Sequence, residues 1–312
     1  MTDLPLVAIT VTYNSATVLE DFLQSVRAQR HESGQDRRHF RTIIIDNGSS
    51  DNTVNMLRQI DDSDIEIILL DKNLGVAAAN NIGIRHAIKI GAETVLLINN
   101  DVLFGPGLYA ELYAWTSRNP NAAVSPVIPY YARPDRIWFG GGAFQWWRGY
   151  IGYHIGCGGP VSELPQEPFI AGYAPTTCLA IPAPWFDKIG LQDERYFIYW
   201  EDTDMARRMI DAGMTIIVDP SLILYHKVSV TTGGRSNPIT LRYLYRNHMI
   251  FMRKHHGSLA TAWALCVLAT KAAARLILGR AHLAELAIEA RALREGLMMP
   301  LTIPETILDT DL

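Results

Sequence analysis

The segment LLINNDVLF (residues 96–104) joins an apolar strand to three polar residues and then returns to apolar residues. The polar residues are Asn99, Asn100 and Asp101, of which only Asp101 carries a charge. A surface turn gives no reason for apolar residues on both sides, so the segment predicts a buried strand with a functional polar end. The structural alternative for Asp101 is an Asx-type turn, in which the side chain bonds nearby backbone.

The first part of the chain alternates between two kinds of segment. Short apolar runs rich in β-branched residues are separated by helix-like stretches. The expected strands are 6–14, 41–48, 65–70 and 94–101, and the expected helices are 16–30, 52–60, 75–90 and 106–118. This alternation is typical of a mostly parallel sheet that helices cover on both faces. The sequence therefore predicts an α/β fold.

Three of these strands end in polar residues. The ends are Thr12–Tyr13–Asn14, Asp46–Asn47–Gly48 and Asn99–Asn100–Asp101. Ligands of open parallel sheets bind in the crevice beyond the carboxyl ends of the strands. If these strands are parallel, their polar ends meet at one edge of the sheet, and we expect a binding crevice there.

The sequence changes in character after about residue 120. Glycines and aromatic residues up to about 180 predict hairpins and loops. RYFIYW (195–200) predicts a buried strand that runs into a helix at 201–213, and strands are expected at 215–219 and 222–226. The remainder, from roughly 238 to 297, is expected to be mostly helical.

The composition is that of an ordinary globular protein, with 312 residues, 48% hydrophobic and 19% charged residues, and a net charge of −4. No basic excess indicates a nucleic-acid surface. Three widely spaced cysteines without a CxxC pair argue against a disulfide framework or a zinc site and favour a reducing cytoplasm. The N-terminus shows no signal-peptide pattern. The uncharged stretch 258–270 is shorter than the roughly 20 residues of a membrane span, so we expect no integral membrane protein.

Two further residues could carry chemistry. Asp202 shares the inward face of its helix with Met205 and Met209, so it is either an N-terminal capping acid or a general base at a pocket. His226 ends an apolar strand, where a lone histidine can also be purely structural. With Asp101, these residues suit a divalent cation plus a base, although the sequence alone does not show that they meet.

Six segments in order resemble family 2 glycosyltransferases of the GT-A fold. They are VAITVTYNS, IIIDNGSSDNTV, NLGVAAANNIGI, LLINNDVLF, GLQDERYFIYWEDTDMARRMIDAG and the following histidine, and they cover about residues 5–230. The YWED segment with its downstream histidine is most similar to the bacterial rhamnosyl- and galactofuranosyltransferase branch. The resemblance implies a GT-A (Rossmann-like) domain at 1–235, with the acceptor side and catalytic helix at about 120–235, and a C-terminal helical region at 236–312.

The resemblance also implies roles for individual residues in an inverting sugar transfer. Thr12, Tyr13, Asn14 and Asp46 would hold the base and ribose of the donor. Gly75 would let the backbone approach the nucleotide, Asn80 would position the donor, and Trp200 would lie beside the sugar and acceptor. Asp202 matches the catalytic base, and Glu201 and Asp204 support it.

The same resemblance implies a metal site for Mg²⁺ or Mn²⁺. Asp101 occupies the last position of the family's DxD-type motif, and His226 matches a histidine that ligates the metal or contacts the pyrophosphate. Asn99 and Asn100 replace acids that the fuller motif can carry, so they are expected to orient donor or backbone by hydrogen bonds. The metal would then depend on Asp101, His226 and donor phosphates, and we expect it to bind weakly without nucleotide.

The segment after His226 is polar and Gly-rich, which fits either a plain surface loop or a lid over the donor. In the lid hypothesis Thr231, Thr232 and Arg235 reach the phosphates. The C-terminal helices either pack on the core or contact an anionic membrane as a peripheral surface. A leucine-rich seam, Leu283, Leu286, Ala290, Leu293 and Leu297, suits packing or a homodimer.

The leading interpretation is transfer of a sugar from a nucleoside diphosphate sugar to a hydroxyl of a glycan or lipid-linked glycan, in cell-surface polysaccharide synthesis at the inner face of the cell membrane. The expected donor is dTDP-L-rhamnose, with UDP-galactofuranose or another UDP-hexose as alternatives. A non-catalytic sugar-nucleotide-binding protein remains a competing hypothesis. A sugar nucleotidylyltransferase would carry a Gly- and Arg-rich loop where TYNSATVLEDF stands, and a dehydrogenase would carry an early GxGxxG. The sequence has neither motif, which argues against both classes.

Overall fold

The computed structural model describes residues 4–30, 40–228 and 237–301. Its chain contacts divide it into two compact units. Unit 1 contains residues 1–144 and 152–232, and unit 2 contains residues 145–151 and 233–312. The expected domain boundary between residues 235 and 236 stays a prediction, because residues 229–236 lie outside the described part of the chain.

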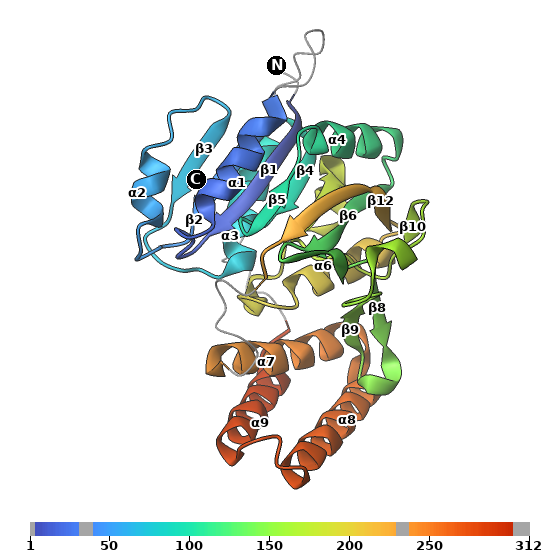
Figure 1. The fold of residues 1–312 in the computed structure, drawn as a ribbon. Coiled ribbons are helices and arrows are strands. Elements are labelled where there is room, and N and C mark those ends of the chain that lie inside the picture. Colours follow the sequence, from blue (N-terminus) through green and yellow to red (C-terminus); the bar gives the residue numbers. More distant parts are fainter. Residues whose placement is uncertain (1–3, 31–39, 229–236, 302–312) are drawn as a thin grey trace. The chain divides into compact units, whose positions relative to one another are not determined.

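Unit 1 is built on one mixed sheet (Figure 1). The strand order is β10-β12-β6-β11-β4-β1-β2-β3, with β5 on β12 and β7 on β6. The strands are β1 Leu4–Thr12, β2 Arg41–Asp46, β3 Ile65–Leu69, β4 Ala92–Ile98, β5 Val102–Phe104, β6 Ala122–Tyr130, β7 Arg133–Phe139, β10 Phe169–Ile170, β11 Cys178–Pro182 and β12 Thr215–His226. The four expected N-terminal strands are present as β1, β2, β3 and β4. β1 pairs in parallel with β2 and β4, and β2 pairs in parallel with β3.

The helices of unit 1 lie on both faces of the sheet. They are α1 Leu19–Arg27, α2 Thr53–Arg58, α3 Val76–Lys89, α4 Leu108–Arg118, α5 Phe186–Ile189 and α6 Glu201–Asp211. Ile45 of β2 lies under Gly83 of α3, whereas Thr42 of the same strand contacts Tyr109 of α4. Residues an odd number of positions apart on a strand point to opposite faces. The helix-covered α/β architecture expected from the sequence is therefore confirmed.

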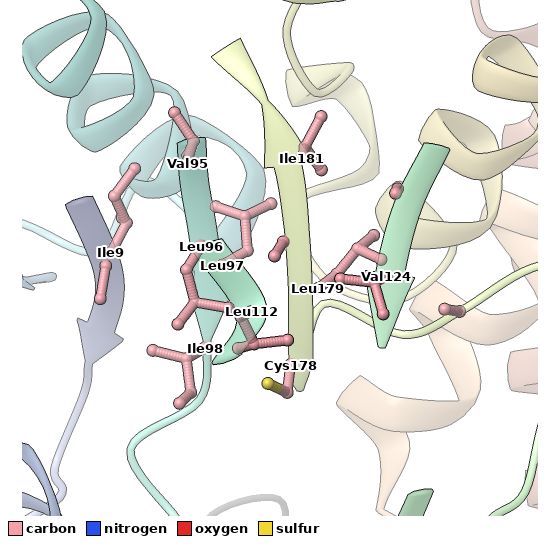
Figure 2. Close-up of a cluster of buried hydrophobic side chains, with 14 of the residues drawn as sticks. Ile9, Val95, Leu96, Leu97, Ile98, Leu112, Val124, Cys178, Leu179 and Ile181 are labelled. Carbon is pink, nitrogen blue, oxygen red and sulfur yellow. The ribbon is translucent and has the colours of Figure 1, made fainter. Parts of the chain in front are cut away.

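The hydrophobic core is centred on the middle strands of the sheet. Figure 2 shows Leu96, Leu97 and Ile98 of β4 against Leu179 and Ile181 of β11. All of these side chains are buried, which explains why β4 is continuously apolar rather than alternating. The start of the segment 96–104 is thus buried in the core, and the polar residues Asn99, Asn100 and Asp101 follow it directly.

Two sequence expectations about strands are wrong. The aromatic stretch 195–200 forms no strand; it contains the end of a 3₁₀ turn (Glu194–Tyr196) followed by residues with positive φ. β-Branched and aromatic residues favour strands only where neighbouring strands pair with them. The two strands expected at 215–219 and 222–226 are one strand, β12, with a register shift between Asp219 and Ile223.

The described residues of unit 2 form three long helices, as the sequence predicts for this region. They are α7 Pro238–His255, α8 Gly257–Ile277 and α9 Leu283–Met298. α7 and α9 pack closely: a Cβ on Gly296 would lie 2.1 Å from the carbonyl oxygen of Arg246. The buried residues of α9 are Glu289, Ala292 and Gly296, whereas Leu283 is exposed. The buried seam of α9 therefore combines the small residues Ala292 and Gly296 with Glu289, and the expected leucine seam does not coincide with it.

The tip of a β-hairpin completes unit 2. The hairpin strands are β8 Gly142–Gln145 and β9 Ile151–His154. His248 Nε2 of α7 lies 2.7 Å from the carbonyl oxygen of Gly149, and Trp263 of α8 donates to that of Trp146 at 2.9 Å. The seven residues of the tip are therefore held by the helices of unit 2.

Candidate active site

A pocket of about 400 Å³ lies in unit 1 at the carboxyl ends of the central parallel strands. It contains the polar end of the opening segment, together with residues that follow β1 and β2 and residues at the start of α6. The sequence-predicted site residues that line it are Tyr13, Gly75, Asn80, Asn99, Asn100, Asp101, Glu201, Asp202 and His226. The crevice expected from the strand ends is present.

Asp101 and His226 face each other in this pocket. Asp101 Oδ2 lies 3.1 Å from His226 Nε2, and both residues are buried. The contact follows from strand pairing, because β5 begins directly after Asp101 and runs antiparallel to the end of β12, with Val102 opposite His226. The apolar residues that follow Asp101 in the sequence thus form the strand that brings it to its partner.

Each member of this pair also has an unused polar atom. Asp101 Oδ1 and His226 Nδ1 are buried and have no hydrogen-bond partner among the described residues. The His226 ring is held instead by Trp138, whose ring centroid lies 4.3 Å away in an edge-on arrangement. A buried carboxylate oxygen without a partner is costly in an apoprotein, so the pair is suited to receiving a further group.

The pair fits one side of a divalent cation. Two neighbouring ligands of an octahedral ion with bonds of about 2.1 Å stand about 3 Å apart, close to the observed Oδ2–Nε2 distance of 3.1 Å. No cluster of three or more Asp, Glu, His or Cys side chains suited to a metal occurs in the described part of the chain. Hard cations can take one or two protein ligands when substrate phosphates supply the others, and a two-ligand site has that character.

Asn99 and Asn100 hold the strand ends together. Asn100 Nδ2 donates to the carbonyl oxygen of Val11 at 2.8 Å and to Ser15 Oγ at 3.1 Å. Asn99 pairs with Thr177 through its backbone N–H at 3.1 Å. These contacts link the end of β4 to the end of β1 and to the residue before β11. Both asparagines hydrogen-bond to protein groups at the rim that carries Asp101.

Thr12, Asn14 and Asp46 lie behind the pocket and do not line it. Asp46 is 1% exposed and accepts hydrogen bonds from Thr12 Oγ1 at 2.9 Å and from Ser49 Oγ at 2.6 Å. Asn14 has a φ of 51° and its Oδ1 accepts from the backbone N–H of Ser50 at 2.8 Å. They connect the loops after β1 and β2, and donor binding through them stays a prediction. Tyr13, which lies between them, is exposed in the pocket.

Gly75 lines the pocket, and its Cα lies close to Phe197. Its φ is 89°, and a Cβ at this position would lie 2.6 Å from both the ring and the carbonyl oxygen of Phe197. The backbone N–H of Val76 donates to that same carbonyl at 2.6 Å. The glycine therefore allows a close approach between the start of α3 and the loop before α6.

Amide side chains on α3 fix the same loop further along. Asn81 bonds both backbone groups of Gln192, accepting from its N–H at 2.9 Å and donating to its carbonyl at 2.8 Å. Asn80 donates to Gln192 Oε1 at 3.0 Å. Asn80, expected to position the donor, thus contacts the loop as well as the pocket.

The loop that leads to α6 has an unusual backbone. Phe197, Tyr199 and Trp200 all have positive φ, at 62°, 66° and 75°. Such conformations are rare for bulky residues and cluster at functional sites. Trp200 is the N-terminal flanking residue of α6 and does not line the pocket. The turn it makes brings the next two residues, both acids, into the pocket wall.

Glu201 and Asp202 are adjacent carboxyl groups without an ion-pair partner in the described part of the chain. Burial, and then the charge of Asp202, raise the pKa of Glu201 to about 8. Burial also raises the pKa of Asp202, which hydrogen bonds from Thr203 oppose. Asp202 is half-buried, and its Oδ1 accepts from the Thr203 N–H at 2.6 Å. A carboxylate with a raised pKa in a pocket is well suited to accept a proton at neutral pH.

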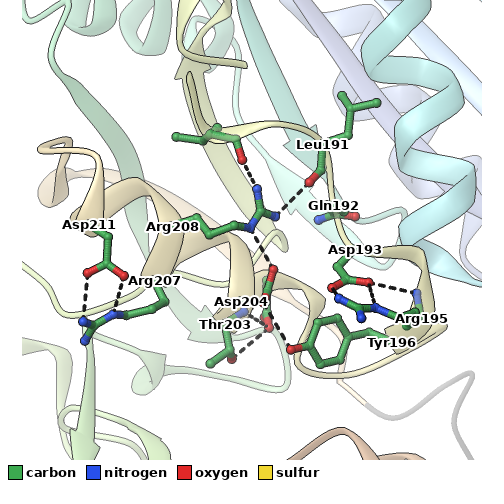
Figure 3. Close-up of polar contacts among 12 residues, drawn as sticks. Leu191, Gln192, Asp193, Arg195, Tyr196, Thr203, Asp204, Arg207, Arg208 and Asp211 are labelled. Carbon is green, nitrogen blue, oxygen red and sulfur yellow. Dashed lines mark hydrogen bonds and ion pairs between the residues drawn. The ribbon is translucent and has the colours of Figure 1, made fainter. Parts of the chain in front are cut away.

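Asp204 lies away from the pocket, within an ion-pair network (Figure 3). Its carboxylate is fully buried, accepts from Tyr196 Oη at 3.1 Å and pairs with Arg208 Nε at 2.9 Å. Arg208 in turn donates to the carbonyl oxygens of Ile189 and Leu191. Asp204 therefore anchors α6 to the preceding loop. The supporting role expected for Asp204 beside Asp202 stays a prediction.

Several pocket residues were not found from the sequence. They include Asn73, Trp138, His154, Thr176, Thr177 and Phe197. Asn47 also lines the pocket, as the polar strand end Asp46–Asn47–Gly48 predicts. Trp138 and His154 come from the glycine- and aromatic-rich region, where no periodic pattern was available. The lid residues Thr231, Thr232 and Arg235 lie outside the described residues.

The mixed sheet with a polar pocket at its carboxyl rim, the Asp–His pair and the acidic helix start form the arrangement that the sequence motifs predict for a glycosyltransferase of the GT-A type. Residues 7–161 match the model of the family described as Glycosyl transferase family 2. This part of the chain is therefore a family 2 glycosyltransferase domain, as its motifs indicated.

Relatives of known activity agree with this assignment. The N-acetylglucosaminyl-diphospho-decaprenol L-rhamnosyltransferase of Mycobacterium tuberculosis is 29% identical over 285 residues, which are 82% of this chain and 86% of the relative. The dTDP-rhamnosyl transferase RfbF of Shigella flexneri is 24% identical over 225 residues, covering 69% of this chain and 71% of the relative.

Solved structures share the fold at low sequence identity. GalNAc-T7, solved with UDP, GalNAc and Mn²⁺, superimposes with a TM-score of 0.62 at 15% identity, over 80% of this chain and 47% of that one. The mannosyltransferase PcManGT of Pyrobaculum calidifontis, solved with GDP-Man and Mn²⁺, gives 0.56 at 18% identity, over 95% of this chain and 81% of that one.

Proposed function

We propose that the protein is an inverting, metal-dependent rhamnosyltransferase that moves L-rhamnose from dTDP-L-rhamnose to a hydroxyl of a lipid-linked glycan. The observation that carries the proposal is the pocket with two separate acidic groups, Asp101 beside His226 and Glu201 beside Asp202. The rhamnosyltransferase relatives support the choice of donor, and the decaprenol-linked substrate in the name of one of them supports the choice of acceptor.

In this proposal Asp202 is the general base. It takes the proton of the acceptor hydroxyl while that oxygen attacks the anomeric carbon and the nucleoside diphosphate leaves. A single displacement inverts the anomeric centre and needs no second carboxylate as nucleophile. The raised pKa of Glu201, about 8, keeps that neighbour largely protonated at neutral pH. One acid of the pair is then available as a base, and the other does not compete for the proton.

Asp101 and His226 would hold Mg²⁺ or Mn²⁺ on the donor side of the pocket. When bound, the ion supplies Lewis-acid stabilisation of the charge that develops on the diphosphate. The protein offers only two ligands among its described residues, so donor phosphates complete the site. Calorimetric titration of Mn²⁺ with and without dTDP tests this: we expect clearly tighter binding with the nucleotide, and equal affinity in both titrations would refute a shared site.

The donor is tested by a thermal-shift screen of nucleotide sugars with Mn²⁺. A ligand that binds only the folded protein raises its melting temperature by mass action. We expect the largest shift with dTDP-L-rhamnose. A larger shift with UDP-galactofuranose or another UDP-hexose would reassign the donor while leaving the transferase chemistry intact. Binding without any transfer to glycan acceptors would support a non-catalytic nucleotide-sugar-binding protein.

The proposed site of action is the inner face of the cell membrane. A lipid-linked acceptor presents its sugar at a membrane surface, so a peripheral enzyme gains from binding there. Product analysis after incubation with a polyprenyl diphosphate-linked glycan and dTDP-L-rhamnose tests this acceptor class. Transfer to free glycans alone would argue against a lipid-linked acceptor.

A further inference from the structure

Helix α8 in unit 2 exposes an uncharged face along its whole length. The helix has 21 residues, and its 18-residue window of mean hydropathy 1.4 is only 17% buried, so it passes the length and composition test for a membrane span. The helix is longer than the uncharged stretch 258–270, because it continues through Lys271 and Arg275. Only Thr261, Ala264 and Leu268 of α8 are buried. The rest of the helix leaves a large apolar surface without a partner among the described residues.

The exposed residues follow the period of a helix. Leu259, Trp263 and Ile277 fall on one side, with exposures of 89%, 44% and 83%. Cys266, Thr270 and Ala273 lie on the same side and are also exposed. A water-facing helix stripe is normally charged or polar, and contiguous apolar patches of this kind mark interaction surfaces. The outward stripe of α8 therefore lacks the charged residues of an ordinary surface helix.

The hairpin tip of unit 2 extends this surface. Trp146 and Trp147 are 60% and 54% exposed. The tip is attached to α8, because Trp263 Nε1 donates to the carbonyl oxygen of Trp146 at 2.9 Å. Tryptophans are enriched where a protein meets the boundary between lipid and water, since the ring is apolar and its N–H is polar.

Both parts of this surface carry positive charge and no negative charge. α8 contains Lys271 and Arg275 but no acid, and the tip 145–151 contains Arg148 but no acid. Lys271 Nζ donates to the carbonyl oxygen of Arg148 at 3.2 Å, and within the described residues neither Lys271 nor Arg148 pairs with a carboxylate. Burial and the nearby Arg148 lower the pKa of Lys271. Two cations held together without an anion favour a negatively charged partner.

We propose that the outward face of α8 and the tryptophan tip form a docking surface for an anionic membrane. The apolar stripe enters the boundary of the acyl chains, and Arg148 and Lys271 contact the lipid phosphates. The proposal deepens the proposed function, because a lipid-linked acceptor is then met at the surface to which the enzyme is bound.

The helix lies along the membrane in this arrangement and does not cross it. Arg275 pairs with Glu289 of α9 at 2.8 Å and bonds Tyr245 of α7 at 3.2 Å. A spanning helix would have to abandon these partners and carry Lys271 and Arg275 into the lipid, which is strongly unfavourable. A second copy of the chain is a poorer occupant, because the same patch on the partner contains no acid in α8 or the tip that could pair with Arg148 and Lys271.

Vesicle co-sedimentation of the full-length protein tests the docking surface. Vesicles of phosphatidylcholine alone are compared with vesicles that also contain phosphatidylglycerol. We expect binding only to the anionic vesicles. Replacing both cations (Arg148→Gln with Lys271→Gln) should weaken binding by about 30-fold, from the usual worth of two basic residues near such a surface. Trp146→Ser with Trp147→Ser, and separately Ile277→Ser, should also weaken it.

The matched control is Ile170→Ser. Ile170 is 74% exposed but belongs to unit 1, so its loss should leave vesicle binding unchanged. Circular dichroism of each variant confirms that it is folded. Failure of the wild-type protein to sediment, or an equal loss in the control variant, overturns the proposal. So does a wild-type dimer, seen in sedimentation velocity, that Ile277→Ser dissociates without any lipid binding.

Vesicle binding is read without any sugar transfer, so it separates this proposal from the proposed function. A protein that binds vesicles but transfers no sugar would refute the function and keep the surface. A protein that transfers rhamnose but ignores anionic vesicles would keep the function and refute the surface.

Discussion

The two acidic groups of the pocket are built in opposite ways. Asp101 lies at the end of a rigid core strand, 3.1 Å from the imidazole of His226, and keeps one oxygen without a partner. Glu201 and Asp202 start a helix after a loop of positive-φ residues and have no cation beside them in the described part of the chain. Burial raises the pKa of both acids of the second group.

This difference supports the roles proposed for the two groups. A carboxylate beside an imidazole can share a cation with it, whereas two crowded acids without a counter-charge favour holding a proton. The first group therefore suits metal binding and the second suits proton transfer. The assignment rests on what surrounds each carboxylate, since the side chains themselves are chemically alike.

The substitution with the largest expected effect is Asp202→Asn, which tests whether the Glu201–Asp202 group accepts the proton. We expect transfer to fall by about 10³-fold, because loss of a general base removes the proton acceptor, while nucleotide affinity stays nearly unchanged. The matched control is Asp211→Asn on the same helix, where the acid is half-exposed and pairs with Arg207. Initial rates and dTDP affinity are measured for both variants. An equal loss of nucleotide binding in Asp202→Asn would move Asp202 from proton transfer to donor binding.

Asp101→Ala tests the proposed metal binding by the Asp101–His226 pair. We expect activity stimulated by Mn²⁺ to fall by about 100-fold, since the only carboxylate beside His226 is removed. Rates are measured over a Mn²⁺ titration, with Asp135→Ala, an exposed acid outside the pocket, as control. Unchanged Mn²⁺ dependence would show that the ion binds elsewhere.

Gly75 lies close to Phe197, in the loop that leads to Glu201 and Asp202, and this contact can be tested by substitution. Gly75→Ala should lower the rate by about tenfold and the melting temperature by several degrees, because its Cβ would meet Phe197 at 2.6 Å. Gly91→Ala is the matched control: it has the same φ of 89° but no atom within 4 Å of a new Cβ. It isolates the backbone strain, about 1 kcal/mol. Equal effects of the two variants would mean that the contact with Phe197 is unimportant.

The smallest expected effect concerns Glu201 and pH. Its pKa of about 8 in the folded protein exceeds the ordinary value of 4.5, so the folded state holds the proton more tightly. Stability contributed by the neutral form is present below the ordinary pKa and is lost as the pH rises through this window. Glu201→Gln should therefore raise the melting temperature by a few degrees at pH 8 and change it little at pH 4. A variant that is less stable than the wild type at pH 8 would contradict the raised pKa.

The parts of the fold that follow a short repeat could be predicted from the sequence. The alternation of apolar strands and amphipathic helices up to residue 118 predicted the described elements there except β5, because burial on both faces leaves a continuous apolar run. The loop 197–200 could not be predicted in this way. Its aromatic residues have strand propensity, and only the contact of Phe197 with the start of α3 shows why the chain turns there.

The candidate site likewise contains some residues that the sequence predicts and others that it does not. Asp101 could be found because polar residues at the end of an apolar strand are visible locally. Its meeting with His226 depends on the pairing of β5 with β12, across 125 positions of sequence, and came only from the resemblance to a family. Trp138 and His154 carry no local signal at all. Asp204 and Arg208 show an i, i+4 pattern, but the spacing does not tell whether the pair is buried.

The hairpin tip has a consequence for how this enzyme can be divided. Because residues 145–151 belong to unit 2 while the rest of their hairpin belongs to unit 1, the polypeptide passes between the two units three times. Truncation before α7 would remove His248 and Trp263, the partners of Gly149 and Trp146. The C-terminal helices are thus not a detachable module, and exchanging them between relatives would require exchange of the hairpin tip as well.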